Sequence, residues 1–458
     1  MLNIPETSLK SASSATKVFA IPRDDQLRGM TALLDADLVR THLGADAVEG
    51  ILGCHVANVN YRPSKKCVAS YVITLPNQTG GAVQQILGYG VCFEANTFAK
   101  VHKRETAKTW AKPPLGPPIT ALPDHQVLLF GYPNDRKLDG LRILESEDGL
   151  RQFLNSYLNG RRLREKKLTV SLIWPNYRPE KRAMLRCRIE AISEHRKPFD
   201  VTTYLKVFSD GSAARMHGAL ARLLTWQGTK ADFTFPRPIA STQDAHVLML
   251  SSVTGVPLRS LIGTGGAREA LERTASALAS LHTYKDPRSP HTTVGDHLNK
   301  ARLRVQSLLQ FTPELNRQAE EIYGLLQGKL PQDEQGSFGF VHGGLGLRDV
   351  LVDSQKIGFI DFDGAHTGPV AADVGRITAA LRNLVLDGNL SEEDELESAF
   401  LEAYCKAARK SFAPKVIAWW TALGLIRLAD QPSRQLRAKG DNKAKQLLDE
   451  AFRVLQSA

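Results

Sequence analysis

Residues 340–374 read FVHGGLGLRDVLVDSQKIGFIDFDGAHTGPVAADV. Two short apolar runs lie inside this stretch, at 350–352 and at 357–360. The segment Asp-Ser-Gln at 353–355 separates them and supplies polar residues of the kind that tight turns use. Two apolar runs joined by a short polar segment are typical of a β-hairpin, so the sequence predicts one here.

Acidic residues lie at the two ends that this hairpin would bring together. A polar segment from His342 to Asp349 precedes the first run, and Asp361 and Asp363 follow the second. Because hairpin strands are antiparallel, the start of the first strand and the end of the second lie at one edge. Phosphoryl transfer uses such an edge, since carboxylate or amide oxygens hold Mg²⁺ on nucleotide phosphates and a base orients the attacking hydroxyl.

The stretch resembles the catalytic core of the aminoglycoside phosphotransferase and choline kinase family, which has a protein-kinase-like fold. The pattern of that family is H-G-D-x-x-x-x-N, a short hairpin, and then I-D. His342 and Gly343 match its start, and Ile360 with Asp361 match its end. Asp373 falls where the family has a buried Asp that braces the catalytic loop.

Two positions depart from the family pattern. Gly344 stands in place of the catalytic Asp, and Asp349 stands in place of the metal-binding Asn. Asp349 keeps an oxygen ligand of similar reach, so the resemblance implies that Asp349 and Asp361 hold Mg²⁺. Gly344 has no side chain, and the loss of a positioned general base lowers a rate by about 10²–10⁴. The remaining motif residues could instead have purely structural roles. His342 and Asp373 could be core hydrogen-bonding residues, and Asp361 could be a surface carboxylate.

The chain's 458 residues are enough for two or three domains with substantial cores. Hydrophobic residues make up 42% and charged residues 23%, as in ordinary soluble globular proteins. The net charge of +11 permits an anionic partner such as a nucleotide, an acidic lipid or nucleic acid, and is equally expected of a basic surface that aids solubility. Because no nucleic-acid recognition motif is found, no specific nucleic-acid partner is expected.

The five cysteines form no CxxC pair and no cluster with histidine. Neither a disulfide framework nor a zinc site is predicted, and a reducing compartment, the cytoplasm, is the expected location. The first thirty residues lack the apolar core of a signal peptide. The late apolar run at 416–426 is too short to span a bilayer and predicts a buried helix, so no membrane span is expected.

The chain before residue 264 shows one order of segments twice. The repeated segments are the motif Asn-Tyr-Arg-Pro between two strands (60–63 and 176–179), a short apolar stretch with a lysine (98–101 and 204–207), a proline-rich loop (117–119 and 236–239) and a strand (126–130 and 246–250). The spacing from Tyr61 to Tyr177 is close to that from Val127 to Val247. The spacing from Lys100 to Lys206 is shorter, which we attribute to a Gly-rich insert at 76–90. The agreement in order favours a duplication.

Within the resemblance, each copy is similar to the small, mostly β N-terminal lobe of a kinase, whose third strand carries a lysine that pairs with nucleotide phosphates. The second copy adjoins the hairpin segment in sequence, so Lys206 is the expected phosphate lysine, and Lys100 with Glu105 would belong to a spare lobe. The segment after Lys206 carries no Glu to pair with it, which is a further departure from the kinase pattern.

No Gly-rich phosphate loop is visible before Lys206. The turn at 176–182 instead offers three cations, Arg178, Lys181 and Arg182. These side chains could contact the phosphates of ATP or another nucleoside triphosphate, or form only the solvated tip of a hairpin.

Apolar spacing predicts a series of helices after residue 264. Their ranges are 269–281, 299–309, 313–326, 370–386, 391–411, 415–429 and 443–457. The expected fold class is therefore α+β and protein-kinase-like, with two small β-rich N-lobes in tandem followed by one mainly helical C-lobe. The expected division is a flexible N-terminal arm (1–33), a first N-lobe-like domain (34–158), a second N-lobe (159–264) and the helical C-lobe with the catalytic-loop hairpin (265–458).

Three functions fit the sequence. The first is a degenerate kinase that binds nucleotide and Mg²⁺ with weak or absent phosphoryl transfer, and that binds a protein partner through the extra N-lobe. The second is an active ATP-dependent phosphotransferase on a small hydroxylated molecule or a lipid head group, with Asp363, another nearby acid or water taking the proton, because a loose transition state needs little early proton transfer. The third is a basic anion-binding protein.

Overall fold

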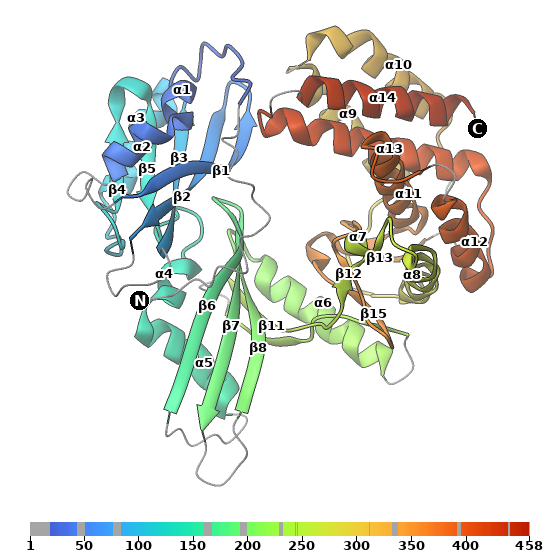
Figure 1. Cartoon of the computed structure of the whole chain (residues 1–458), viewed down its shortest axis with the longest axis horizontal. Coiled ribbons are helices and arrows are strands. Elements are labelled where there is room, and N and C mark those ends of the chain that lie inside the picture. Colours follow the sequence, from blue (N-terminus) through green and yellow to red (C-terminus); the bar gives the residue numbers. More distant parts are fainter. Residues whose placement is uncertain are drawn as a thin grey trace. The chain divides into compact units, whose positions relative to one another are not determined.

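The computed structural model describes residues 19–43, 51–76, 84–159, 167–192, 199–228, 232–242, 244, 246–310, 312–331, 338–391, 395–437 and 440–457. The chain forms two compact units (Figure 1). The sheet unit consists of Met1–His217, Pro238–Ser251 and Arg434–Ala438, and the helical unit of Gly218–Arg237, Ser252–Ser433 and Lys439–Ala458. Separate helices and antiparallel sheets confirm the expected α+β class.

The first sheet of the sheet unit has the strand order β1-β2-β3-β5-β4, and all its pairs are antiparallel. Its strands are β1 (Gly53–Arg62), β2 (Lys66–Leu75), β3 (Gln84–Phe93), β4 (Ile119–Leu122) and β5 (Val127–Gly131). Helices α1 (Met30–Leu34) and α2 (Ala36–Leu43) precede it, and α3 (Ala95–Thr106) follows β3. The side chain of Glu94 starts α3 by accepting hydrogen bonds from the backbone of Asn96 and Thr97.

The second sheet repeats this arrangement with the order β6-β7-β8-β11-β10. Its strands are β6 (Lys167–Arg178), β7 (Arg182–Ile192), β8 (Phe199–Phe208), β10 (Pro238–Ser241) and β11 (Val247–Ser251), and α6 (Ser212–Gln227) follows β8 as α3 follows β3. In the sequence, α4 (Gly140–Glu145) and α5 (Glu147–Asn159) come after the strands of the first sheet and before those of the second.

The strand register is the same in both sheets. Tyr61 pairs with the second residue of β2, and Tyr177 pairs with the second residue of β7. The turns that follow each hold one residue in the left-handed region, Ser64 at φ 54° and Glu180 at φ 60°. Corresponding pairs and corresponding turn conformations are what two copies of one folded unit require.

The proposed match between Lys100 and Lys206 is wrong. Lys100 lies in helix α3, whereas Lys206 lies in strand β8. The third strand of the first sheet is β3, which covers the later part of the segment at 76–90 that the sequence predicts as a Gly-rich insert. Val91 holds the place of Lys206, since each residue pairs with the third residue of the preceding strand and the second residue of the following strand. The error arose because a helix with one apolar face also places apolar residues beside a lysine.

The two sheets share one hydrophobic core. Tyr177 of β6 packs edge-on against Tyr89 of the first sheet, with ring centroids 6.4 Å apart, and against Tyr132 at 6.5 Å. Leu185 and Val247 from the second sheet are completely buried in the same cluster as Phe130 from the first. Burial of apolar surface therefore stabilises the two sheets together.

The predicted N-terminal arm at 1–33 is too long. Residues 1–18 lie outside the described residues, but Leu27, Met30 and Leu33 are buried against the first sheet. The carboxylate of Asp24 also accepts a hydrogen bond from the Tyr61 hydroxyl at 2.7 Å. Buried apolar side chains next to a polar anchor hold this segment in place from about Asp24 onward.

The helical unit contains the predicted hairpin, formed by β14 (Val350–Val352) and β15 (Ile357–Phe359). The other strands are β9 (Phe233–Thr234), parallel to β15, β12 (Val256–Pro257), paired with β14, and the pair β13 (Phe338–Val341) and β16 (His366–Pro369). The helices are α7 (Leu258–Leu261), α8 (Ala267–His282), α9 (Val294–Leu309), α10 (Asn316–Gly328), α11 (Ala371–Leu386), α12 (Leu396–Ala408), α13 (Pro414–Arg434) and α14 (Gly440–Gln456). Each helix predicted after residue 264 is confirmed, with shifted ends.

Helices α9, α10, α11, α13 and α14 surround the main core of the helical unit (Figure 1). Trp419 is completely buried there, and its indole nitrogen donates a hydrogen bond to the carbonyl of Leu326 at 2.9 Å. No helix in the described ranges is long and apolar enough to cross a bilayer.

Candidate active site

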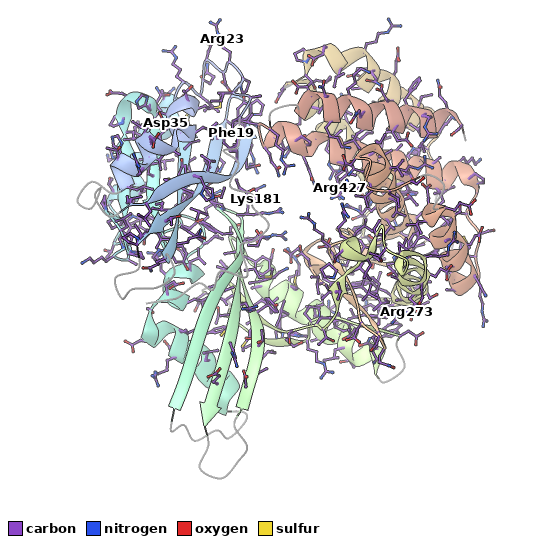
Figure 2. The ribbon with its side chains drawn as sticks, viewed as in Figure 1. Phe19, Arg23, Asp35, Lys181, Arg273 and Arg427 are labelled. Atoms are coloured by element: carbon purple, nitrogen blue, oxygen red, sulfur yellow. The ribbon has the colours of Figure 1, made fainter. Side chains whose placement is uncertain are left out.

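The hairpin is held by the helix that precedes it. The guanidinium of Arg273 on α8, labelled in Figure 2, donates to the carbonyl of Asp353 in the turn at 2.7 Å. At the other end of the hairpin, the backbone nitrogen of Ile360 donates to the carbonyl of Asp349 at 2.9 Å. This last pair sets Asp349 and Asp361 at the same edge of the hairpin, as the sequence predicts.

Asp373 braces the loop before the hairpin. Its carboxylate is completely buried and accepts hydrogen bonds from the backbone nitrogens of His342 at 2.6 Å and Gly343 at 3.0 Å. The His282 ring donates to it at 3.3 Å, while the other ring nitrogen lies 2.7 Å from the Tyr404 hydroxyl. Burial alone would raise the pKa of Asp373, but the His282 hydrogen bond and the nearby charges lower it to about 2.

The imidazole of His342 has a structural role in this conformation. Its Nε2 donates a hydrogen bond to the carbonyl oxygen of Ile360 at 2.8 Å. Nδ1 is buried and has no hydrogen-bond partner among the described residues. Because water does not reach Nδ1, a bound hydroxyl could not pass its proton there.

The position of Gly344 is open. A Cβ built on this residue would meet only the ring of His342, at 3.7 Å from Nδ1 and 3.9 Å from Cε1. No described carboxylate lies within 4 Å of that point, and this includes Asp363, which is half-buried in the short turn after the hairpin. The space of the family's catalytic Asp is therefore not filled by another acid from the described part of the chain.

Asp349 and Asp361 form the expected pair of carboxylates. Burial raises the pKa of Asp349, and the nearby negative charge of Asp361 raises it further. Asp361 occupies the left-handed region at φ 68° and ψ 53°, a conformation that costs free energy and is concentrated at functional sites. Two close carboxylates, of which Asp349 resists ionisation, suit a divalent cation, which would stabilise both negative charges.

A complete metal site made by protein alone is not formed. Within the described ranges, no group of three or more histidine, cysteine or acidic side chains is placed to bind a metal ion. Mg²⁺ at nucleotide sites is usually held by one or two carboxylates together with phosphate oxygens and water. Asp349 and Asp361 fit that arrangement, in which the nucleotide completes the coordination.

Lys206 is buried in the middle of β8, and helix α6 after it contains no acidic residue. The kinase-type lysine–glutamate pair therefore cannot form with this helix. Lys206 belongs to the sheet unit, whereas Asp349 and Asp361 belong to the helical unit. The convergence of these three side chains on one nucleotide stays a prediction.

The turn between β6 and β7 carries the three predicted cations. Arg178 and Lys181 are exposed, and Arg182 is half-buried. Partial desolvation, followed by the positive charges of Arg62 and Arg178, lowers the pKa of Lys181 to about 8. Figure 2 shows Lys181 at the tip of this hairpin. A turn with crowded positive charges is suited to an anion such as phosphate.

Sequence reasoning missed the group that fixes this turn. Glu180 is buried and pairs with Lys66 of the first sheet and with Arg136. Its backbone nitrogen donates to Asp135 at 2.9 Å, and the Tyr177 hydroxyl donates to the same carboxylate at 2.9 Å. Burial raises the pKa of Asp135 to about 6. The signal in the sequence that could have identified this group is a single acidic residue, Glu180, within a turn of basic residues.

A known protein family matches the part of the chain that contains these candidate site residues. The model of the phosphotransferase enzyme family matches residues 191–420, from β7 to α13. A search of curated proteins gives no significant match. Similar solved structures include the choline kinase of Cryptosporidium parvum Iowa II, at 11% identity and a TM-score of 0.49 over 68% of this chain and 96% of that chain.

Two other phosphotransferases are also similar in structure. Aminoglycoside phosphotransferase APH(3'')-Id of Streptomyces rimosus is 18% identical, with a TM-score of 0.40 over 60% of this chain and 97% of that chain. Spectinomycin phosphotransferase APH(9)-Ia is 14% identical, with a TM-score of 0.44 over 68% of this chain and 98% of that chain. The family model spans half of the sequence and includes Lys206, Asp349, Asp361 and Asp373. The chain belongs to the phosphotransferase enzyme family.

Proposed function

We propose that this protein binds a nucleoside triphosphate with Mg²⁺, transfers the phosphoryl group slowly or not at all, and acts by binding a partner. Gly344 carries the proposal, because it offers no side chain at the position of the catalytic Asp and no described carboxylate lies within 4 Å of its Cβ position. The absence of a positioned base lowers the rate of proton transfer by about 10²–10⁴.

The proposal assigns a role to each remaining group. Asp349 and Asp361 hold Mg²⁺, which neutralises charge on the phosphate oxygens when it is bound. Lys206 contacts the phosphates from the third strand, and Arg178 and Lys181 contact them from the preceding turn. The brace at Asp373 keeps the loop in its inherited conformation, so that binding is preserved while the proton acceptor is missing.

We further propose that the first sheet is a duplicated N-lobe that has lost its nucleotide site and serves as the docking surface for a protein partner. Val91 occupies the position of Lys206 in the shared register, and an apolar side chain cannot pair with phosphate. The first sheet also holds the turn of the second through Lys66 and Glu180. These two observations support a structural and partner-binding role for this copy.

Nucleotide binding is tested by calorimetric titration of the full chain with ATP, with and without Mg²⁺. We expect Mg²⁺-dependent binding that Lys206→Gln and Asp361→Asn each weaken by roughly tenfold or more. Lys103→Gln, which removes an exposed lysine from α3, serves as the control and should leave the affinity unchanged. The absence of binding, or equal affinity in all variants, would refute the nucleotide site.

An active phosphotransferase is the second candidate, and the intact arrangement of Asp373, Asp349 and Asp361 supports it. The acceptor would be a small hydroxylated molecule or a lipid head group. An assay of ADP release over candidate acceptors separates the two functions. Turnover at the ordinary rate of about 1–10³ s⁻¹ that Asp361→Ala abolishes would establish this candidate and overturn catalytic impairment.

A further inference from the structure

The helical unit contains a second cluster of cations, next to the loop that carries Asp349. We propose that Arg304, Arg376 and Arg427 bind the carboxylate or phosphate group of a small acidic molecule. This site is made by the helical unit alone and does not depend on nucleotide binding.

Three helices bring these arginines to one pocket. The pocket is lined by His297 and Arg304 of α9, Ala372 and Arg376 of α11, and Trp420, Leu423, Gly424 and Arg427 of α13. Positions 297 and 304 are two turns apart on α9 and therefore share a face. Figure 2 shows Arg427 on α13.

Two glycines let α11 and α13 approach closely enough to place the arginines together. A Cβ on Gly375 would lie 2.5 Å from the backbone carbon of Trp420, and a Cβ on Gly424 would lie 2.5 Å from the Cβ of Ala379. Arg376 directly follows the first glycine, and Arg427 lies about one turn after the second. The close contact of the two helices thus creates the neighbouring guanidinium groups.

The described lining of this pocket contains three arginines and no acidic residue. The Nε atom of Arg427 is buried and has no hydrogen-bond partner among the described residues. Burial, with the nearby charges of Arg376 and Arg304, lowers the pKa of Arg427 to about 9. The side chain remains positive at neutral pH, and an anion would satisfy both its charge and its free donor.

The two carboxylates that act on Arg376 and Arg427 have other partners. Asp373 acts on Arg376 but accepts hydrogen bonds from the His342 and Gly343 backbone and from His282. Asp349 acts on both Arg376 and Arg427, and it faces Asp361 as the expected Mg²⁺ pair. Metal binding would use the negative charge of Asp349, which would leave these arginines still more in need of an anion.

His297 adds a neutral polar group to the pocket. Its ring packs edge-on against Trp420, with centroids 4.8 Å apart, and its Nε2 is buried without a partner in the described structure. Burial lowers the pKa of His297 to about 3, so the ring is neutral at physiological pH. A neutral imidazole can donate one hydrogen bond to an anionic oxygen.

The pocket size limits what enters. The enclosed cavity has a volume of about 20 Å³. That space accommodates one oxygen-sized group. One oxygen of a carboxylate or phosphate would enter between the arginines, and the rest of the molecule would lie at the mouth.

The test uses thermal unfolding of the full chain with inorganic phosphate, sulfate or malonate, against chloride at equal ionic strength and with EDTA present. We expect the oxyanions to raise Tm by about 2–4 °C above chloride. Phosphate against malonate shows which acid is preferred. Arg427→Gln and Arg304→Gln should each weaken phosphate binding by roughly tenfold. Arg304→Gln keeps the test valid if the first variant fails to fold.

A matched control separates this pocket from other cations. Arg302→Gln removes an exposed arginine from the same helix, α9, and should leave phosphate binding unchanged. Loss of phosphate binding in Arg302→Gln, or a Tm no higher in oxyanions than in chloride, would overturn the proposal.

Discussion

Gly343 and Gly344 are neighbours with opposite structural requirements. Gly343 has φ +70°, and a Cβ there would lie 2.0 Å from the carbonyl oxygen of Gly364, whereas Gly344 has room for a side chain. We therefore expect Gly343→Ala to lower the free energy of unfolding by about 2 kcal/mol or more. Gly344→Ala should leave it unchanged or raise it by about 0.4–1 kcal/mol. Urea unfolding measures both changes. A large loss of unfolding free energy in Gly344→Ala would contradict the room for a side chain at this position.

The brace at Asp373 predicts a dependence of stability on acid. Its pKa of about 2 lies below that of an unfolded Asp, so its contribution is fully present above about pH 4 and is lost as the pH falls toward 2. A depression of about two units corresponds to roughly 2–3 kcal/mol. Asp373→Asn should lose at least this amount at pH 7 and show a flatter stability curve between pH 4 and 2. Parallel curves for the two proteins would contradict the brace.

Ionisation of Asp349 is expected to have the opposite effect on the stability of the fold. Because its pKa is raised in the folded protein, its ionised form destabilises the metal-free chain, and the effect grows as the pH rises from about 4 through the folded pKa. Asp349→Asn should therefore raise Tm at pH 7 without Mg²⁺ and match the wild type near pH 4. Glu320→Gln on α10, an exposed carboxylate, is the control and should change Tm little. A lower Tm for Asp349→Asn at pH 7 would refute the repulsion.

For single residues, the sequence predicted those positions that a local pattern specifies. The spacing of a short motif specifies a loop and a hairpin, and it therefore predicted where His342, Asp349, Asp361 and Asp373 lie. The arginine pocket could not be found, since it depends on the crossing of three helices that are distant in sequence. Nor could spacing alone show that the free nitrogen of His342 is closed to water.

Among the elements, the turn between β6 and β7 depends on one buried acid. Glu180 is held between Lys66 and Arg136, and its own side chain is only 2% exposed. Removing one partner from a buried ionic group leaves uncompensated charge and typically costs about 3–5 kcal/mol. Glu180→Gln should lower the free energy of unfolding by about that amount in urea. Glu190→Gln, at a half-exposed pair with Arg188, should cost less than about 1 kcal/mol. Equal losses would show that Glu180 does not hold the turn.

Elements with strong periodicity were the most predictable. The hairpin and the helices after residue 264 were found because tight turns and apolar stripes are local signals. The prediction of a strand around Lys100 was wrong. A stretch of four residues in which a lysine has apolar neighbours fits one face of a helix as well as it fits a strand. Strand pairing corrected the match and placed Val91 in register with Lys206.

For the whole molecule, the sequence predicted the class and the family but not the division of the chain. Two sheets that repeat one order could be expected from the repeated motif Asn-Tyr-Arg-Pro. Their shared core could not, because it depends on which faces pack, and a repeat in sequence does not specify that. The two sheets fall in one unit, with Arg434–Ala438 from the chain's later part, and the hairpin and most helices fall in the other.

The central claim is that the chain keeps Lys206, Asp349 and Asp361 for nucleotide and Mg²⁺ and lacks the proton acceptor at Gly344. The most direct measurement compares Mg²⁺-dependent ADP release by the wild type and by Gly344→Asp, since the position can hold the new side chain without a clash. We predict very slow release by the wild type and an increase of at least roughly tenfold in the variant, abolished by Asp361→Asn. Rapid release by the wild type, or no increase in a Gly344→Asp variant that binds ATP, would contradict this claim.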